Sequence, residues 1–173
     1  MKEWLGWAAD GAHSCRIAAS VVRSLDRMCR DAGDLETGGV LVGRYAEDAM
    51  VAYVTEATPP PADSQRGRTW FARGVRGLRE LLAIRWRARD RIHYVGEWHF
   101  HPTDAIEPSA VDFAQMKTIA LAGEYRCAEP ILVIVGRRIG RGIRPMRVFV
   151  CPRGEPSKEV LPTPAAGGVR PLA

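Results

Sequence analysis

The hydrophobic positions along the chain follow two spacings, which together predict a mixture of helices and strands. In three stretches the apolar residues recur every three or four positions, the spacing of an amphipathic helix. Elsewhere, short runs rich in β-branched and aromatic residues predict strands. In chain order we expect a short strand or helix anchor over 4–7, a helix over 14–30, strands over 35–45 and 50–57, a helix over 75–86, a strand over 92–101, a helix from 109, and strands over 131–136 and 145–151.

This order of elements predicts an α/β fold (mixed α+β) in which helices flank a central mixed β-sheet. At 173 residues the chain is long enough for one domain with a sizeable core, and too short for two. We place this domain at residues 1–151. Residues 152–173 are rich in Pro, Gly and Ala, so they predict a tail that is disordered unless a partner holds it. Residues 46–49 predict a hairpin turn, and 58–68 predict a surface loop.

The composition is that of an ordinary globular protein, with 46% hydrophobic and 26% charged residues. No apolar run approaches the ~20 residues needed to cross a bilayer, and the N-terminus has no adequate apolar segment for a secretion signal. We therefore expect a cytoplasmic protein without a membrane partner. The four cysteines form no Cys-x-x-Cys pair, which favours buried or incidental thiols over a structural zinc site.

The net charge of +5 comes almost entirely from arginine. Arginines cluster over 73–91 and again over 137–147, so nucleic-acid binding has to be weighed. We favour a solvated helix face and a basic turn, because the net charge is modest and no motif that reads RNA or DNA is present. An acidic patch on a protein partner would satisfy the same arginines.

The most informative stretch runs from residue 95 to 116. His99 and His101 stand two apart on a predicted strand, so both imidazoles point to one face. Pro102 ends that strand, and Asp112 lies in the first turn of the helix that starts at Ser109. Two imidazoles and one carboxylate leave the fourth position of a tetrahedral zinc site to water, which indicates a catalytic metal site.

Each half of this pattern also has a simpler interpretation. Ser109 and Asp112 alone form an ordinary helix cap, and a lone His-x-His on a strand is more often a hydrogen-bonded or exposed pair. The joint occurrence favours the metal, because two of only four histidines lie directly upstream of the cap. Both interpretations can hold together, since a cap can fix Ser109 and aim Asp112 at the metal.

A glycine pair, Gly38 and Gly39, lies inside the strand predicted over 35–45. It resembles a phosphate-binding loop only superficially, because no Gly-Lys-Ser/Thr follows. Glycines inside a strand more often mark a bulge or a close backbone approach beside a site. We therefore do not expect nucleotide binding here.

Together these segments resemble the JAMM motif of the JAB/MPN metalloprotease family. The matching residues are Glu36-Thr-Gly-Gly and Gly96-Glu-Trp-His99-Phe-His101-Pro102, followed by Ser109 and Asp112. Seven residues separate His101 from Ser109, and two separate Ser109 from Asp112. The resemblance covers about residues 14–150, and its His-x-His-Pro and Ser-x-x-Asp part is highly specific. It implies the family's cytidine-deaminase-like architecture. Phe100 departs from the usual Ser or Thr, but alternation along the strand turns it away from the ligand face.

The resemblance implies a zinc isopeptidase or peptidase that cuts after the C-terminal glycine of a ubiquitin-like protein. His99, His101 and Asp112 would hold Zn²⁺, Glu36 would be the general base, and Ser109 would steady the oxyanion. Glu97 is the rival, because it shares the histidines' face and could serve as ligand, base or partner of a ligand. Glu36 is preferred only because the family pattern puts the glutamate before the glycine pair.

Among bacterial relatives, the motif resembles JAB proteins that accompany ubiquitin-activating- and conjugating-enzyme-like proteins in antiphage operons. The implied partners are therefore a ubiquitin-like protein, or another protein with such a C-terminus, its conjugates, and those enzymes. Two alternatives remain: trimming the C-terminus of a sulfur-carrier protein, and a non-catalytic MPN scaffold. The loop over 58–70 and the arginine-rich turn are candidates for guiding substrate.

Overall fold

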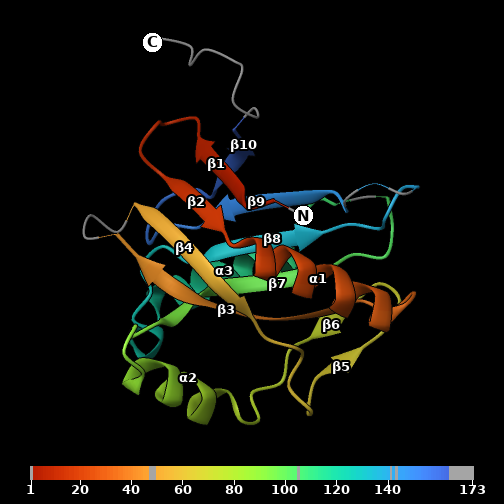
Figure 1. Ribbon diagram of the computed structural model, residues 1–173, viewed down its shortest axis with the longest axis horizontal. Coiled ribbons are helices and arrows are strands. Elements are labelled where there is room, and N and C mark those ends of the chain that lie inside the picture. The colour runs from red at the N-terminus through yellow and green to blue at the C-terminus, as the bar shows by residue number, and fades with distance from the viewer. Residues whose placement is uncertain (1, 47–49, 105, 141, 143, 164–173) are drawn as a thin grey trace.

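The computed structural model describes residues 2–46, 50–104, 106–140, 142 and 144–163. Within them, eight strands form a mixed sheet that closes on itself, and three α-helices lie against it (Figure 1). Only β2–β4 and β7–β8 are parallel pairs. The strand order around the barrel is β1 (Trp4–Ala8), β10 (Lys158–Pro162), β9 (Met146–Val150), β8 (Ile131–Val135), β7 (His93–Phe100), β3 (Thr37–Tyr45), β4 (Val51–Ala57) and β2 (Ser14–Ile17).

The predicted α/β fold with a central mixed sheet and flanking helices is confirmed. Closure of that sheet into a barrel was not predicted, because it depends on two pairings between strands that are not consecutive in the chain, β1 with β10 and β2 with β4. The remaining elements are α1 (Ala19–Ala32), α2 (Leu78–Arg87), α3 (Ala110–Leu121), the 3₁₀ turn η1 (Gly123–Tyr125), and a small hairpin of β5 (Gln65–Arg66) and β6 (Phe71–Ala72).

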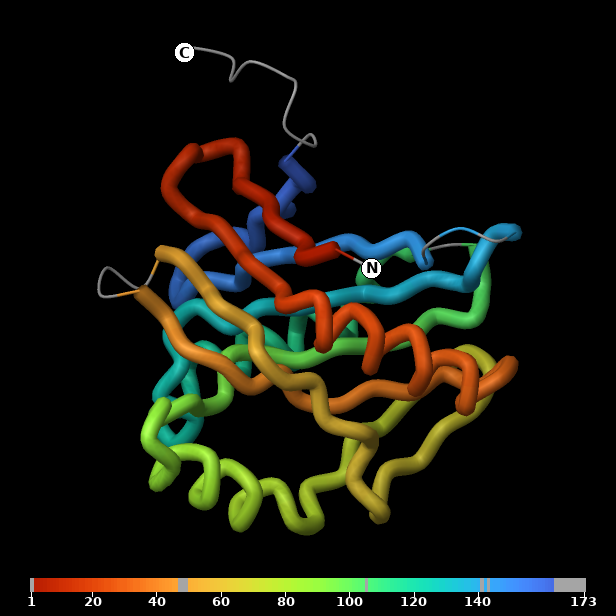
Figure 2. Tube along the Cα trace, viewed as in Figure 1, coloured from red at the N-terminus to blue at the C-terminus, as the bar shows by residue number. Residues whose placement is uncertain are grey.

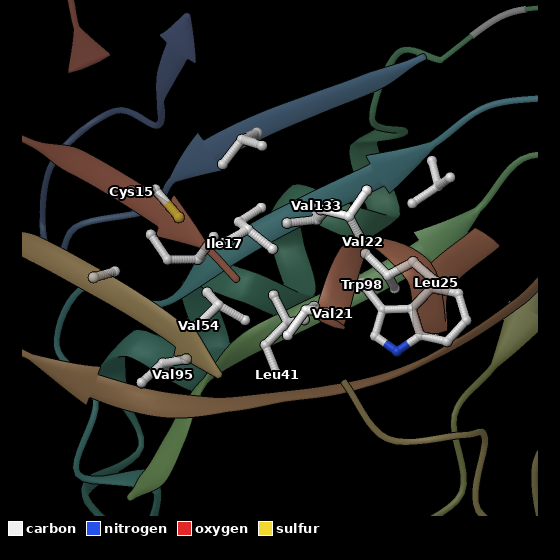
Figure 3. Packing of buried hydrophobic residues seen from close by; sticks show 14 of the residues in the cluster. Cys15, Ile17, Val21, Val22, Leu25, Leu41, Val54, Val95, Trp98 and Val133 are labelled. Carbon is white, nitrogen blue, oxygen red and sulfur yellow. The ribbon is translucent and has the colours of Figure 1, made fainter. Parts of the chain in front are cut away.

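The core has two layers, one on each face of the sheet around β7. Helix α1 packs Val21, Val22 and Leu25 onto one face, against side chains that include Leu41 and Trp98 (Figure 3). Helix α3 covers the other face with its own apolar residues. Alternation along β7 therefore turns Trp98 and Phe100 toward α1 and leaves the histidine face toward α3.

The segment between β4 and β7 crosses one side of the barrel, where it carries β5, β6 and α2 (Figure 2). None of the residues of α2 is buried, although its apolar side is turned to the second core layer. An ion pair between Arg85 of α2 and Glu56 of β4, with N–O distances of 2.6 and 3.0 Å, holds the helix to the barrel. Helix α2 is therefore attached by partly buried contacts and this ion pair, and not by deep burial.

The predicted helix over 14–30 is wrong in its first turn. Residues Ser14–Ile17 form β2, which pairs with β1 and β4, and the helix starts only at Ala19. The error has a physical cause: Ile17 lies four residues before Val21, so the helical spacing continues by coincidence into a strand whose position depends on distant partners. All four cysteines are free and buried, as predicted.

The predicted tail from residue 152 is also wrong in part. Strand β10 pairs with β1 and β9 and buries Val160, so the barrel extends past the boundary predicted at residue 151. One apolar anchor is enough because the strand gains backbone hydrogen bonds on both sides, a contribution that composition does not reveal. Residues 164–173 of the predicted tail, and residues 47–49 of the predicted turn over 46–49, lie outside the described residues.

Several arginines from the two basic clusters are satisfied within the chain. Arg138 and Arg144 both bind the buried carboxylate of Asp26, with N–O distances of 2.7 and 3.1 Å. Arg147 binds Glu159 at 2.8 Å. Carboxylates of the same chain therefore neutralise part of the second basic cluster. Across the described ranges, no helix combines the length and the apolar character needed to cross a membrane.

Candidate metal centre

The structure brings the three predicted metal ligands together. His99 and His101 come from the end of β7, and Asp112 comes from the first turn of α3. His99 Nδ1 lies 2.6 Å from Asp112 Oδ1, and His101 Nε2 lies 4.0 Å from Asp112 Oδ2. One ligand atom from each of the three residues lies within 4.8 Å of the others. Side chains 13 residues apart in sequence thus form one cluster of nitrogen and oxygen donors.

Backbone pairing explains the placement of the two histidines. Strand β7 lies between β3 and β8, and His99 stands opposite Gly38 on one side and Ile134 on the other. His101 continues this pairing beyond the strand, since its amide donates to the Val135 carbonyl at 2.9 Å. Both imidazoles are therefore held at the edge of the barrel, on the face toward α3. Phe100, between them, packs into the α1 layer as alternation predicts.

The residues present fit a zinc ion. His99 is only 6% exposed, and its Nε2 is buried without a hydrogen-bond partner among the described residues, a costly arrangement that a metal bond would relieve. In a tetrahedral site, zinc bonds of about 2.1 Å put two ligand atoms roughly 3.4 Å apart. The three ligand atoms lie within 4.8 Å of one another, so they would have to move closer together to bind the metal.

Ser109 fixes Asp112 through a capping box at the start of α3. The Ser109 amide and hydroxyl both donate to Asp112 Oδ2 at 2.7 Å, and the Asp112 amide donates back to the hydroxyl at 3.1 Å. Burial by itself raises the pKa of the Asp112 carboxyl, but the hydrogen bonds with His99 and Ser109 outweigh it and lower that pKa to about 2. Asp112 is thus an anion held in one orientation, as a metal ligand requires.

Replacing Ser109 with Ala is expected to remove the side-chain cap and lower the free energy of unfolding by about 1 kcal/mol. In a protein of this size, that loss corresponds to a Tm about 2–4 °C lower. Thermal unfolding of the metal-free protein, followed by circular dichroism, measures the effect. Ser109→Thr keeps a hydroxyl cap and is the control. An unchanged Tm in Ser109→Ala would show that the box adds no stability.

Glu36 lies beside this cluster. It directly precedes β3, where the register Thr37 to Phe100 puts it next to His101, and it is half-buried. Its amide donates to the Gly67 carbonyl at 2.8 Å, so the backbone on both sides of the carboxylate is fixed. Burial raises the pKa of Glu36, the Asp112 charge raises it further, and His99 opposes them. Glu36 is therefore near enough to Asp112 and His99 to be affected by their charges.

Glu97 has other partners. It shares the histidine face as alternation predicts, but its side chain is fully buried and bound to Arg73 Nε at 2.7 Å and to the Tyr94 hydroxyl at 3.0 Å. Each carboxylate oxygen therefore has its own donor. Glu97 does not belong to the cluster of possible ligands found among the described residues.

The glycine pair in β3 is explained by close approach, as predicted. A Cβ at Gly38 would lie 2.7 Å from the Phe71 ring and 2.9 Å from the His99 ring, and one at Gly39 would lie 2.4 Å from the Thr58 carbonyl oxygen. Any side chain at Gly38 would therefore push on a candidate metal ligand.

Phe71 and Arg73 also contact the histidine face of β7, and the sequence did not predict either contact. The Phe71 ring meets the His99 ring edge-on, with centroids 5.7 Å apart and an interplanar angle of 76°. Both residues fall between the predicted loop and the predicted helix, in a stretch with no periodicity. No local signal in the sequence marks them.

Comparison with known proteins decides the family. A family model described as prokaryotic homologs of the JAB domain matches residues 18–151. The chain belongs to this prokaryotic JAB family. The resemblance drawn from the motif is thereby confirmed, and the match covers every element from α1 to β9.

Several relatives resemble this JAB protein along most of its length. A CD-NTase/cGAS isopeptidase of Enterobacter hormaechei is 45% identical over 150 residues, which are 86% of this chain and 82% of the relative. A protein of the same name from Pseudomonas aeruginosa is 37% identical over 60% of this chain and 65% of its own. A probable metalloprotease of Sinorhizobium fredii is 31% identical over 69% and 73%. A solution structure of a Desulfitobacterium hafniense protein shares the fold, with a TM-score of 0.58 and 19% identity over 83% of this JAB chain and 87% of that one.

Proposed function

We propose that this JAB protein is a zinc-dependent isopeptidase that cleaves after the C-terminal glycine of a ubiquitin-like protein, or of another protein with such a C-terminus. The convergence of His99, His101 and Asp112 carries the proposal. The name of two relatives, CD-NTase/cGAS isopeptidase, supports a substrate in which a CD-NTase or cGAS-like protein is joined to a target through an isopeptide bond. We place the reaction in a bacterial antiphage-type conjugation system, with activating- and conjugating-enzyme-like proteins as its partners.

In this proposal His99, His101 and Asp112 hold Zn²⁺. When bound, the metal polarises the scissile carbonyl and lowers the pKa of a water molecule to about neutral. Glu36 would take a proton from the attacking water as the water oxygen adds to the carbonyl carbon, and would give that proton to the lysine amine as the isopeptide C–N bond breaks. Its place beside the ligand cluster, but outside it, supports this role, because a base has to stand within reach of the water and not on the metal.

In the proposal, the Ser109 hydroxyl alternates between two roles: it orients Asp112, and it stabilises the oxyanion that develops on the substrate. Its single hydroxyl hydrogen goes to Asp112 Oδ2 in the structure, at 2.7 Å. To stabilise the developing oxyanion, this hydrogen has to turn from Asp112 to the substrate. Asp112 keeps the hydrogen bond from the Ser109 amide while this happens, so the ligand stays oriented.

The other functions have less support. Processing of a sulfur-carrier C-terminus uses the same chemistry and differs only in substrate. A non-catalytic scaffold does not require three converging ligands. In a scaffold without a metal, the buried Nε2 of His99 would lower the stability of the fold and serve no purpose. Nucleic-acid binding is weakened by the internal ion pairs of the arginine clusters.

A cleavage assay tests the proposal. The zinc-loaded chain is mixed with two substrates of the same CD-NTase-like or ubiquitin-like protein, one joined by its C-terminal glycine to a lysine and one fused linearly to a second protein. We expect mass spectrometry to show cleavage after the glycine of the isopeptide-linked substrate, lost with a chelator and restored by Zn²⁺. Zinc-loaded protein that cleaves neither substrate would contradict the proposal. Cleavage confined to a sulfur-carrier fusion would favour the processing protease.

A further inference from the structure

We infer that Arg73 and Glu97 form a positioning pair that holds Phe71 against His99 and so tunes the metal centre. The inference rests on the proposed function for its consequence in catalysis, but its physical content concerns metal binding alone. Neither residue touches the clustered ligand atoms. They act through Phe71 and through β7, the strand that carries His99.

Among the ion pairs of the described residues, the pair of Arg73 and Glu97 is the most deeply buried. The Arg73 side chain is 6% exposed and that of Glu97 is 0% exposed, with 2.7 Å between Arg73 Nε and Glu97 Oε2. Arg73 also donates to the Gly74 carbonyl at 2.9 Å, and the Tyr94 hydroxyl donates to the second oxygen of Glu97 at 3.0 Å. Removing either charge alone would leave the other buried and unpaired, which is strongly destabilising.

Two contacts fix how the β6 segment lies on β7. Phe71 and Arg73 stand two residues apart, and they contact His99 and Glu97, which also stand two residues apart on β7. The segment therefore lies antiparallel across the histidine face, and its two contacts keep each other in register. Arg73 is the directional contact, because an ion pair with defined hydrogen bonds allows less sliding than an aromatic edge.

This arrangement restrains the His99 ring. Asp112 holds Nδ1 at 2.6 Å, and the Phe71 ring packs at 5.7 Å between centroids. Gly38 leaves the space that the two rings share. With the ring fixed between an acceptor and an aromatic neighbour, the unpartnered Nε2 has one direction in which to bind a metal.

The pair also closes this face against water. Arg73 and Tyr94, the two partners of Glu97, line a cavity of about 1020 Å³ between α2 and the barrel. Helix α2, on the far side of that cavity, has no buried residue. If Arg73 were released, water could reach Glu97 and the strand beside His99 from the cavity.

Stability alone does not account for the pair. A buried ion pair contributes little compared with apolar side chains of similar volume, and replacing both partners together is often neutral or stabilising. A role in orientation predicts a different outcome for the double replacement: the fold survives and the metal site loosens. This difference separates positioning from simple structural support.

The test is the Arg73→Met and Glu97→Met double variant. We expect it to fold with a Tm near that of the wild type, and to bind Zn²⁺ about 10–100-fold more weakly, the usual effect of losing support for a metal ligand. Competition with a chelator measures the affinity for Zn²⁺ alone. With Co²⁺ in its place, the visible absorption spectrum should change, because it reports the geometry of the ligands. Arg73→Lys, which keeps the charge, should fall between the two.

Arg85→Met with Glu56→Met is the matched control. That ion pair tethers the same segment through α2, but it meets β4 and not β7. Its removal should leave Zn²⁺ affinity within about twofold of the wild type. An equal loss in the control, or unchanged affinity and spectrum in the folded Arg73 and Glu97 variant, would overturn the inference.

A second variant decides the matter if the double variant does not fold. Phe71→Leu leaves both charges in place and removes only the ring beside His99, so we expect weaker Zn²⁺ binding in the same direction. Unchanged affinity in this variant would overturn the inference. Because every readout is metal binding, a wild-type protein that binds Zn²⁺ but cleaves no substrate would refute the proposed function and leave this test intact.

Discussion

Replacing Glu36 with Gln is expected to lower the cleavage rate by about 100- to 10,000-fold while zinc stays bound. Gln keeps the size and hydrogen-bonding shape of the side chain but cannot accept a proton, and loss of a general base typically has an effect of that size. Glu36 does not belong to the ligand cluster found among the described residues, so the metal should remain. The rate constant kcat/KM and the zinc content of the same preparation measure the two effects together.

Glu97→Gln is the control for this assignment, since Glu97 was the rival on sequence grounds. Its carboxylate already accepts from Arg73 and Tyr94, so the neutral variant should disturb stability and metal affinity before it disturbs proton transfer. Full zinc content with lost cleavage in Glu97→Gln, together with an active Glu36→Gln, would assign the base to Glu97 instead.

Replacing Asp112 with Asn is expected to remove metal binding, with a loss of affinity greater than about 100-fold. The carboxylate is the one anion in the cluster, and weakening a supporting group alone already has an effect of about 10–100-fold. Wild-type protein at a Zn²⁺ concentration 1,000 times its Kd should gain about 4 kcal/mol of stability, and a variant with more than about 100-fold weaker binding should gain less than about 1.4 kcal/mol. Thermal unfolding with and without Zn²⁺ measures this difference.

Asp10→Asn provides a matched control at the other end of the barrel. Asp10 forms a His–Asp pair of the same length with His13, 2.6 Å between Nδ1 and Oδ2, and Glu129 lies 3.7 Å from His13 Nε2. Among the described residues, however, these three groups do not form a cluster that could hold a metal. This variant should keep the full stabilisation by Zn²⁺. Equal loss in both variants would mean that Zn²⁺ acts on the fold through some route other than the proposed centre.

The ligand cluster was predictable because each step of the prediction is local. Alternation on a strand puts His99 and His101 on one face, and the cap geometry of Ser109 and Asp112 follows from four residues of sequence. Only the contact between the end of β7 and the start of α3 depends on the tertiary structure, and the family resemblance implied it. The structure then separated the two glutamates: Glu36 lies beside the cluster, and Glu97 is bound to Arg73 and Tyr94. Sequence spacing does not specify these contacts.

Other features could not be predicted because they depend on distant partners. Strand β2 has helical spacing, and β10 lies in a stretch with the composition of a tail, yet both join the barrel through backbone pairing with β1. Phe71 and Arg73 acquire their roles only when the segment between β4 and β7 folds back over the histidine face. Contacts of this kind leave no periodic trace in the sequence.

A crystal grown with Zn²⁺, with data collected at the zinc absorption edge, would show whether the three side chains bind one metal ion. We expect one anomalous peak per chain, about 2.0–2.2 Å from a nitrogen of His99, a nitrogen of His101 and an oxygen of Asp112. A map without a peak at that position, or a peak bound by other side chains, would contradict the proposed zinc site.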